Sequence, residues 1–175
     1  MLFRSLDAKA RIVGLNGERV VELEQFFRGP GQTVMAPEEI LAEIIIPPTK
    51  PSLVGEYIKF SPREMMDLAY IGVAVAFIFN PSDKRCENVR IALGAVSPTP
   101  MRARGAESLL EGRILTEELA EKAGAEAARE SKPISDVRSS AEYRREMVRV
   151  NTKRALLNAV AGRAESWVER RARRY

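Results

Sequence analysis

The stretch with the most chemical potential is Tyr-Ile-Lys-Phe-Ser-Pro-Arg-Glu-Met-Met-Asp-Leu-Ala, residues 57–69. It places Lys59 at the end of a short β-type segment, Arg63 in a loop and Asp67 before an apolar run. A cation at a strand end can bind a phosphate or the electron-rich edge of a flavin ring, and a carboxylate can accept hydrogen bonds from a ring or a ribose. The alternative is that the three side chains only pair with one another in the loop, and this stretch taken alone favours that structural interpretation.

No self-contained active site is predicted elsewhere. The sequence has no histidine, which excludes Ser-His-Asp and Cys-His arrangements and the commonest metal ligand. Cys86 is the single cysteine, so an internal disulfide, a CxxC pair and a cysteine-ligated cluster are excluded as well. Walker, GxGxxG, nucleophile-elbow and HExxH motifs do not occur. We therefore assign no catalytic and no metal-binding residues.

Three weaker features favour structural roles. The acidic pairs Glu38-Glu39 and Glu117-Glu118 are adjacent in sequence, which is typical of a turn and of a helix start rather than of converging carboxylates. The loop Gly29-Pro30-Gly31 could expose amides to a phosphate, but no helix is predicted to begin behind it. Cys86 lies beside a turn with no histidine to activate it, so we expect an inert thiol.

The elements of the first third are predicted to be β-structure. Residues 8–13 and 18–23 form a hairpin, because Asn16-Gly17 can supply the positive φ angles of its turn. The run 40–46 is rich in β-branched residues and predicts a strand. Three prolines at positions 47, 48 and 51 then favour an extended connection, where we place a domain boundary.

The remainder predicts an α+β domain. Strands at 57–60, 68–79 and 89–93 can form a three-stranded antiparallel sheet, and it is followed by three helices that pack on it. The expected helices run from 102 to 110, from a capping Thr116 to about 130, and onward from a capping box formed by Ser139 and Glu142. The apolar face expected for the last helix is Tyr143, Met147, Val150, Leu157 and Val160.

Four stretches together resemble one family. They are Ala-Pro-Glu-Glu-Ile-Leu-Ala-Glu-Ile (36–44), Tyr-Ile-Lys-Phe with Asp-Leu-Ala-Tyr-Ile-Gly-Val-Ala-Val-Ala (57–60 and 67–76), Arg-Ile-Ala-Leu-Gly-Ala-Val-Ser-Pro-Thr-Pro-Met-Arg-Ala (90–103), and Pro-Ile-Ser-Asp-Val-Arg-Ser-Ser-Ala-Glu-Tyr-Arg-Arg-Glu-Met (133–147). In sequence and order they are similar to the medium, FAD-binding subunit of molybdenum hydroxylases of the carbon monoxide dehydrogenase and xanthine dehydrogenase type.

The resemblance implies a role for each matching residue. It places Leu41 beside a flavin, Lys59 in contact with the cofactor and Asp67 close to the isoalloxazine ring, whereas Arg63 receives no definite role. It implies that FAD lies between two domains and carries electrons from a [2Fe-2S] subunit, in a complex whose molybdenum cofactor is on another subunit. We accordingly expect residues 1–53 to be the C-terminal remnant of an FAD-binding domain, a hairpin and a strand, residues 54–165 to be the flavoprotein C-terminal domain, and 166–175 to be a basic tail.

The sequence departs from the family because the glycine-rich loops that hold the FAD pyrophosphate precede the region matched. Losing four charge-assisted hydrogen bonds would cost about 6–12 kcal/mol, so we expect weak or no FAD binding by this chain alone. The leading hypothesis is an electron-transfer flavoprotein component in which a separate chain or an upstream segment supplies the pyrophosphate half of the site. The alternative is a cofactor-free interaction or assembly module that docks on the molybdenum and iron–sulfur subunits.

Charge and hydropathy constrain partners and location. The net charge is +4, and much of the positive excess lies in the terminal Glu-Arg-Arg-Ala-Arg-Arg-Tyr. Binding of nucleic acid through this tail is a third hypothesis that we rank last, because no aromatic residues alternate with the arginines to stack on bases. We expect no nucleic-acid partner. The longest apolar run, 68–79, is too short to span a bilayer, and the lone cysteine suits reducing cytoplasm.

Overall fold

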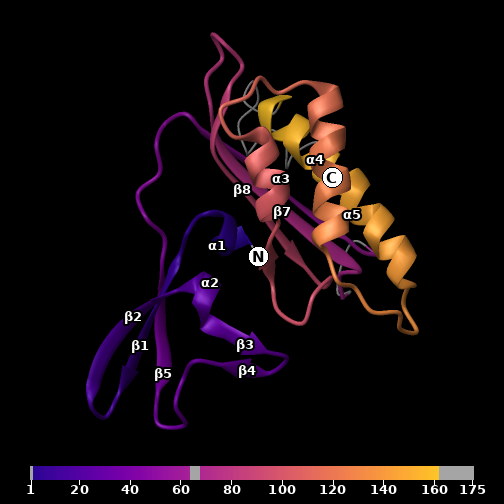
Figure 1. The fold of residues 1–175 in the computed structure, drawn as a ribbon. Coiled ribbons are helices and arrows are strands. Elements are labelled where there is room, and N and C mark those ends of the chain that lie inside the picture. Colours follow the sequence, from indigo (N-terminus) through magenta and orange to yellow (C-terminus); the bar gives the residue numbers. More distant parts are fainter. Residues whose placement is uncertain (1, 64–67, 162–175) are drawn as a thin grey trace.

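The computed structural model describes residues 2–63 and 68–161, which form two units joined by an extended connection (Figure 1). The first unit contains a three-stranded antiparallel sheet in the order β2-β1-β5, a two-stranded ladder of β3 and β4, and two single-turn helices. Its elements are α1 (Leu2–Ser5), β1 (Lys9–Gly14), β2 (Gly17–Glu22), α2 (Leu23–Phe26), β3 (Phe27–Gly29), β4 (Gln32–Thr33) and β5 (Ile40–Ile45). The expected hairpin and following strand are therefore present.

Two details of this unit differ from the sequence prediction. In the β1–β2 turn only Gly17 has a positive φ, +116°, so Asn16 does not share that role. The Gly29-Pro30-Gly31 segment, considered above only as a loop, closes a small β3–β4 ladder that the sequence did not predict, with Gly31 at φ +68°. Proline followed by a glycine with positive φ is the pairing that a tight turn favours, and ladders as short as this one give no periodicity to detect.

The second unit is a four-stranded antiparallel sheet in the order β6-β7-β8-β9 with three helices against it. Its elements are β6 (Leu53–Phe60), β7 (Ile71–Phe79), β8 (Cys86–Gly94), β9 (Met101–Arg102), α3 (Arg104–Leu110), α4 (Glu117–Glu130) and α5 (Ala141–Ala161). The α+β class is confirmed. The sheet has one more strand than expected, because Arg102 belongs to the two-residue β9 and not to the helix that follows it.

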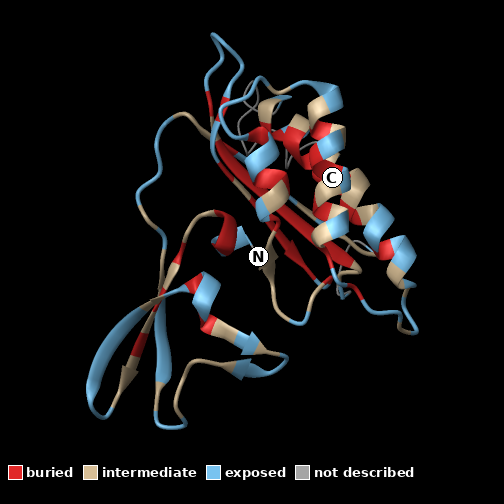
Figure 2. Cartoon of the chain, in the orientation of Figure 1, coloured by how far each residue is buried: buried red, intermediate tan, exposed pale blue. Residues whose placement is uncertain are grey.

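The core of this unit lies between the helices and one face of the sheet (Figures 1 and 2). Alternate residues such as Val73, Val75 and Phe77 of β7 pack into it, while the intervening Ala74 and Ala76 are buried outside this cluster. Helix α5 packs on β6 and β7, α3 packs on β8, and α4 lies between α3 and α5. On the N-terminal side, α1 packs against β7 and β8 and so brings the two units together.

The starts of the helices follow capping chemistry. The Thr116 hydroxyl accepts a hydrogen bond from the Leu119 amide at 3.1 Å, as predicted. Helix α5 is capped by Ser140, whose hydroxyl accepts from the Tyr143 amide at 3.2 Å, so the predicted Ser139 is one residue early.

The buried face of α5 also differs from the prediction. The fully buried positions are Arg144, Val148, Asn151, Thr152, Ala155, Leu156 and Ala159. Of the predicted residues, Met147, Leu157 and Val160 are half-buried and pack against the core, Val150 is half-buried, and Tyr143 is exposed. The apolar pattern therefore predicts only one side of the buried face, because the helix also buries an arginine, an asparagine and a threonine.

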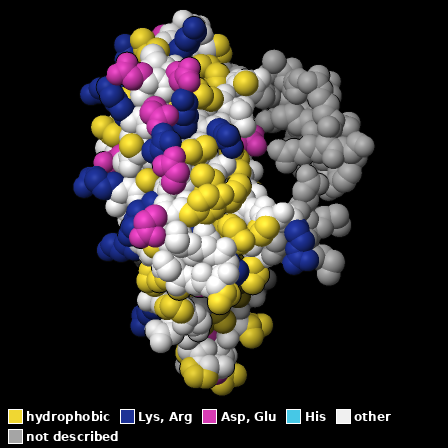
Figure 3. Space-filling view, turned by 90° about the vertical axis from the view of Figure 1, so that its right-hand side faces the viewer, with side chains coloured by type: hydrophobic (Ala, Val, Ile, Leu, Met, Phe, Trp, Pro, Cys, Tyr) yellow, Lys and Arg dark blue, Asp and Glu magenta, His cyan; other side chains and the backbone are white. Residues whose placement is uncertain are grey.

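The surface of the helical layer is mixed in charge. Figure 3 shows basic and acidic side chains interspersed over the side formed by α4 and α5. Several are paired there, for example Lys153 with Glu117 at 2.9 Å and Lys122 with Glu118 at 2.7 Å. The basic tail, residues 166–175, on which the nucleic-acid hypothesis rests, lies outside the described residues. Within residues 2–63 and 68–161, none of the helices is long and apolar enough to cross a membrane.

Candidate functional site

Leu41, the first predicted site residue, lies near the start of β5 at the edge of the N-terminal sheet. It stands opposite the buried Ile12 of β1 in the register, yet its side chain is 41% exposed. The preceding turn is held by Glu39, whose amide donates to the Ala36 carbonyl and whose carboxylate accepts from the Ala36 amide at 2.7 Å. Leu41 is thus an apolar surface residue at a fixed place in the fold.

Lys59, the second predicted residue, lies near the end of β6 in the other sheet. Along β6 the burial alternates, so Lys59 and Tyr57 are exposed on one face while Ile58 and Phe60 pack toward the core. Its partner across the ladder is the buried Gly72 of β7. Lys59 is therefore an exposed cation near the end of a strand, next to the loop that follows it.

The loop after Lys59 is closed at its base. The Tyr70 amide donates to the Phe60 carbonyl at 2.8 Å, and the two rings contact edge to face with centroids 6.3 Å apart. Phe60 also packs against Tyr143 of α5 at the same centroid distance. The third predicted residue, Asp67, lies outside the described residues, and Arg63 is exposed on the described part of the loop.

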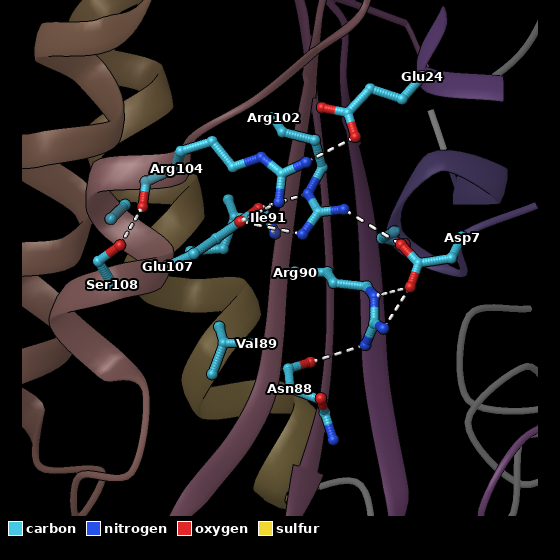
Figure 4. Close-up of polar contacts among 12 residues, drawn as sticks. Asp7, Glu24, Asn88, Val89, Arg90, Ile91, Arg102, Arg104, Glu107 and Ser108 are labelled. Carbon is cyan, nitrogen blue, oxygen red and sulfur yellow. Dashed lines mark hydrogen bonds and ion pairs between the residues drawn. The ribbon is translucent and has the colours of Figure 1, made fainter. Parts of the chain in front are cut away.

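Leu41 and Lys59 thus belong to different sheets, and their relative placement depends on how the two units are joined. Asp7, between α1 and β1, forms ion pairs with Arg90 of β8 and with Arg102 of β9, the latter at 3.2 Å (Figure 4). A second contact joins Arg104 of α3 to Glu24 of α2 at 2.6 Å. These contacts connect β8, β9 and α3 of the second unit to the first unit.

Arg102 is itself held by a buried carboxylate. Its guanidinium donates to both oxygens of Glu107, with Nη2 to Oε2 at 2.9 Å, and the two side chains are only 6% and 7% exposed. Glu107 also accepts the Ile91 amide of β8 at 2.9 Å. Because Glu107 binds both Arg102 and a strand amide, Arg102 is held in place by contacts that do not involve Asp7. We call Asp7, Arg90, Arg102 and Glu107 the junction cluster.

The junction cluster borders a cleft of about 490 Å³ between the units, which Glu24, Arg104, Ser108 and Glu111 also line. Each arginine there is paired with a carboxylate of this chain. The cleft therefore suits a positioning role and offers no surplus charge for an anionic ligand. Sequence reasoning missed this cluster, although Arg102 stands in the quoted Pro-Met-Arg stretch, with Glu107 five residues later as the available signal.

The acidic residues and the cysteine for which the sequence favoured structural roles are placed in such roles by the structure. Hydrogen bonds from Arg19, and then from the Ala36 amide, lower the pKa of Glu39 to about 2. Glu117 and Glu118 pair with different lysines, so their carboxylates do not converge. Burial raises the pKa of the Cys86 thiol to about 12, which leaves it protonated and unreactive. No cluster of potential metal ligands occurs in the described part of the chain.

Comparison with family models covers most of the chain in two segments. Residues 56–159 match the CO dehydrogenase flavoprotein C-terminal domain, and residues 1–49 match the FAD binding domain in molybdopterin dehydrogenase. The gap between the two matches falls on the proline-rich connection and the start of β6.

Curated relatives and solved structures agree with this match. The chain is 32% identical to the nicotine 6-hydroxylase medium subunit of Paenarthrobacter nicotinovorans over 92% of this chain and 55% of that protein. It is 30% identical to the xanthine dehydrogenase FAD-binding subunit of Escherichia coli O157:H7 over 89% and 53%. A chain of carbon monoxide dehydrogenase from Hydrogenophaga pseudoflava superposes with a TM-score of 0.86 at 32% identity, covering 91% of this chain and 55% of that one. The chain spans about half the length of the relatives it matches.

Proposed function

Because this chain belongs to the family of FAD-binding medium subunits of molybdenum hydroxylases, we propose that it forms one wall of a flavin site and serves electron transfer within such a complex. The observation that carries the proposal is the exposed Lys59 near the end of β6, next to a loop whose base is closed by the hydrogen bond from the Tyr70 amide to the Phe60 carbonyl. We propose the iron–sulfur and molybdenum-cofactor subunits as partners and the cytoplasm as the location.

The residues present fit one side of a flavin. Lys59 would place a positive charge at the electron-rich edge of the ring, Leu41 would supply an apolar contact, and Asp67 would accept a hydrogen bond. Bound FAD would supply the ability to accept electrons from an iron–sulfur donor and to pass them to a final acceptor. The junction cluster would hold Leu41 and Lys59 at a constant separation, so that both can contact one ligand.

We propose that the pyrophosphate half of the site corresponds to the part of the relatives that lies outside the region matched by this chain. The proposed division is an FAD-binding remnant at 1–53, a C-terminal domain at 54–165 and a tail at 166–175. The separate hydrophobic clusters of the two units support the first boundary, although β6 begins at Leu53. Without the missing half we expect this chain to bind FAD weakly.

FAD titration followed by flavin fluorescence tests the proposal. The chain alone should show no sub-micromolar binding, whereas its complex with a polypeptide that supplies the pyrophosphate-binding part should be yellow. In that complex Lys59→Ala should weaken FAD binding about 10-fold, the loss expected for one charge-assisted hydrogen bond. Lys50→Ala, which removes an exposed lysine of the connection, is the matched control and should bind FAD as the parent does. Tight binding by the chain alone, or a colourless complex, would refute the proposal.

A cofactor-free assembly module is the second candidate, and one observation favours it. Ile134 and Val137 are 71% and 103% exposed on the loop before α5. That loop is held by Asp136, which accepts from the buried Arg144 at 2.7 Å. Under this alternative, association with the other subunits would be insensitive to Lys59→Ala and Asp67→Ala but weakened by Val137→Asp.

A further inference from the structure

The loop between α4 and α5, residues 131–140, is exposed but firmly held. The backbones of Asp136 and Ser139 exchange two hydrogen bonds, of 3.1 and 3.2 Å, which close a tight turn. The Asp136 carboxylate also accepts the Ser139 amide at 3.2 Å and the guanidinium of the buried Arg144 at 2.7 Å. The turn is therefore fixed to the buried side of α5.

Two large apolar side chains of this loop are left in water. Val137, one of the two central residues of the turn, is 103% exposed, and Ile134 is 71% exposed. Figure 2 shows the loop as a mainly exposed segment at one end of the second unit. Because buried groups hold the turn in place, the loop keeps these apolar side chains exposed. An ordered loop with this property is typical of a protein-binding surface.

The charges around the two apolar residues have a net sign. Residues 131–145 carry four basic and two acidic side chains, a surplus of two positive charges, namely Lys132, Arg138, Arg144 and Arg145 against Asp136 and Glu142. Asp136 is shared between Arg138 and Arg144, and Lys132 and Arg145 are exposed. In protein interfaces a charged rim around an apolar centre steers and selects the partner. This surface therefore fits a partner with an acidic face.

The loop lies at the end of the sheet that carries Lys59 (Figure 1). Arg144 donates a second hydrogen bond, of 3.1 Å, to the carbonyl of Ala95, which directly follows β8. The last residue of β8, Gly94, stands opposite Gly72 of β7, which in turn stands opposite Lys59. Adjacent strands are about 4.8 Å apart, so the backbone of Lys59 is about 10 Å from the strand end to which the loop is attached.

We propose that the loop 131–140 is the docking site for an acidic one-electron carrier protein whose acidic face surrounds an apolar patch. The inference rests on the proposed function, to which it adds the class of the electron acceptor. Each docked carrier would leave with one electron, so two carriers in succession would reoxidise a flavin that holds two, and its protons would pass to water. The carrier is a different occupant from the subunits that the cofactor-free alternative assigns to the same loop.

Titration of the full chain with rubredoxin, a small acidic iron protein, tests the surface, and basic cytochrome c is the control probe. Calorimetry at about 50 mM salt should give a dissociation constant of about 10–100 µM for rubredoxin, at least about 5-fold higher at about 300 mM salt, and no binding of cytochrome c.

Variants of the turn separate its apolar and electrostatic contributions. Val137→Asp should weaken rubredoxin binding about 10-fold or more, because it places a negative charge against the acidic face, whereas Val137→Thr should weaken it about 3-fold through loss of apolar contact alone. Leu15→Asp is the matched control, since it adds the same charge at an 88% exposed position in the β1–β2 turn, and it should leave binding within about 2-fold.

A redox experiment distinguishes failure of the docking site from failure of the proposed function. In the yellow complex, reduced with stoichiometric dithionite, Val137→Asp should slow the bleaching of rubredoxin about 10-fold and leave the reduction of a small dye, dichlorophenolindophenol, unchanged. Absence of rubredoxin binding, equal binding of cytochrome c, equal loss in Leu15→Asp, or displacement of rubredoxin by the iron–sulfur or molybdenum subunit would each overturn the docking site. Rubredoxin binding that Val137→Asp weakens, together with a colourless complex, would refute the proposed function alone. A yellow complex in which Val137→Asp and the parent reduce rubredoxin at equal rates would refute the docking site alone.

Discussion

Replacement of Glu107 by alanine should be among the most destabilising single changes in this protein. The side chain is 7% exposed and accepts hydrogen bonds from Arg102 and from the Ile91 amide. The substitution leaves the 6% exposed guanidinium of Arg102 with Asp7 as its remaining ionic partner, 3.2 Å away, and leaves a strand amide without an acceptor.

The magnitude follows from burial. Removing one partner of a buried ion pair costs about 3–5 kcal/mol, and an orphaned buried amide costs about 1–3 kcal/mol. The two losses share one carboxylate and Asp7 offsets part of the first, so we expect a total of about 3–4 kcal/mol. With a urea m value of about 2 kcal/mol/M, the midpoint should fall by about 1.5–2 M.

Equilibrium urea unfolding followed by far-UV circular dichroism measures this change. Glu107→Gln keeps the size of the side chain and an acceptor for Ile91, so it should lie between the parent and the alanine variant. Glu118→Ala is the matched control, because its pair with Lys122 is 78% and 65% exposed and should leave the midpoint unchanged. A loss below about 1 kcal/mol for Glu107→Ala would show that the pair is not buried as described.

Three further predictions concern other parts of the fold. Gly124→Ala, which in an open helix would stabilise by about 1 kcal/mol, should instead lower stability by about 1–3 kcal/mol in thermal unfolding, because its Cβ would lie 2.5 Å from the Arg149 carbonyl oxygen of α5. The stabilisation from the lowered pKa of Glu39 is present above its ordinary value of 4.5 and is lost as pH falls toward about 2, so Glu39→Gln should flatten the acid dependence of stability over that window. Cys86, with its pKa raised to about 12, should react with a thiol reagent at pH 8 far more slowly in the folded protein than in urea, and equal rates would contradict its burial.

The sequence predicted well where local signals decide the structure. Asn16-Gly17 marked the β1–β2 hairpin, the alternation at Val89 and Ile91 marked β8, and Thr116 marked the start of α4. Lys59 could be singled out because a lysine that ends a strand before a loop is a local pattern. Its surroundings, including Gly72 opposite, depend on a strand pairing that the pattern does not specify.

Most of the features that the sequence did not predict depend on contacts between residues far apart in the chain. The ion pairs of Asp7 join residues 83 and 95 positions apart, and nothing near Asp7 in the sequence indicates them. The face of α5 was predicted only in part, because Arg144 and Thr152 are buried as well, which apolar periodicity cannot anticipate. One of the acceptors of the buried Arg144, the Ala95 carbonyl, lies 49 residues away in the sequence.

The ion pairs between the units imply that the contact between the units should weaken before the larger unit unfolds. The pair of Asp7 with Arg90 and the pair of Glu24 with Arg104 involve side chains that are 25–60% exposed, so dissolved salt should weaken them. The sheet and helices of the second unit depend on apolar packing, which salt does not screen. Raising ionic strength should therefore loosen the attachment of the N-terminal sheet, which the packing of α1 on β7 and β8 also holds, and make this sheet more accessible to protease while the larger unit stays folded. A flavin-binding surface formed by both units would then be lost when the units separate, before either unit unfolds.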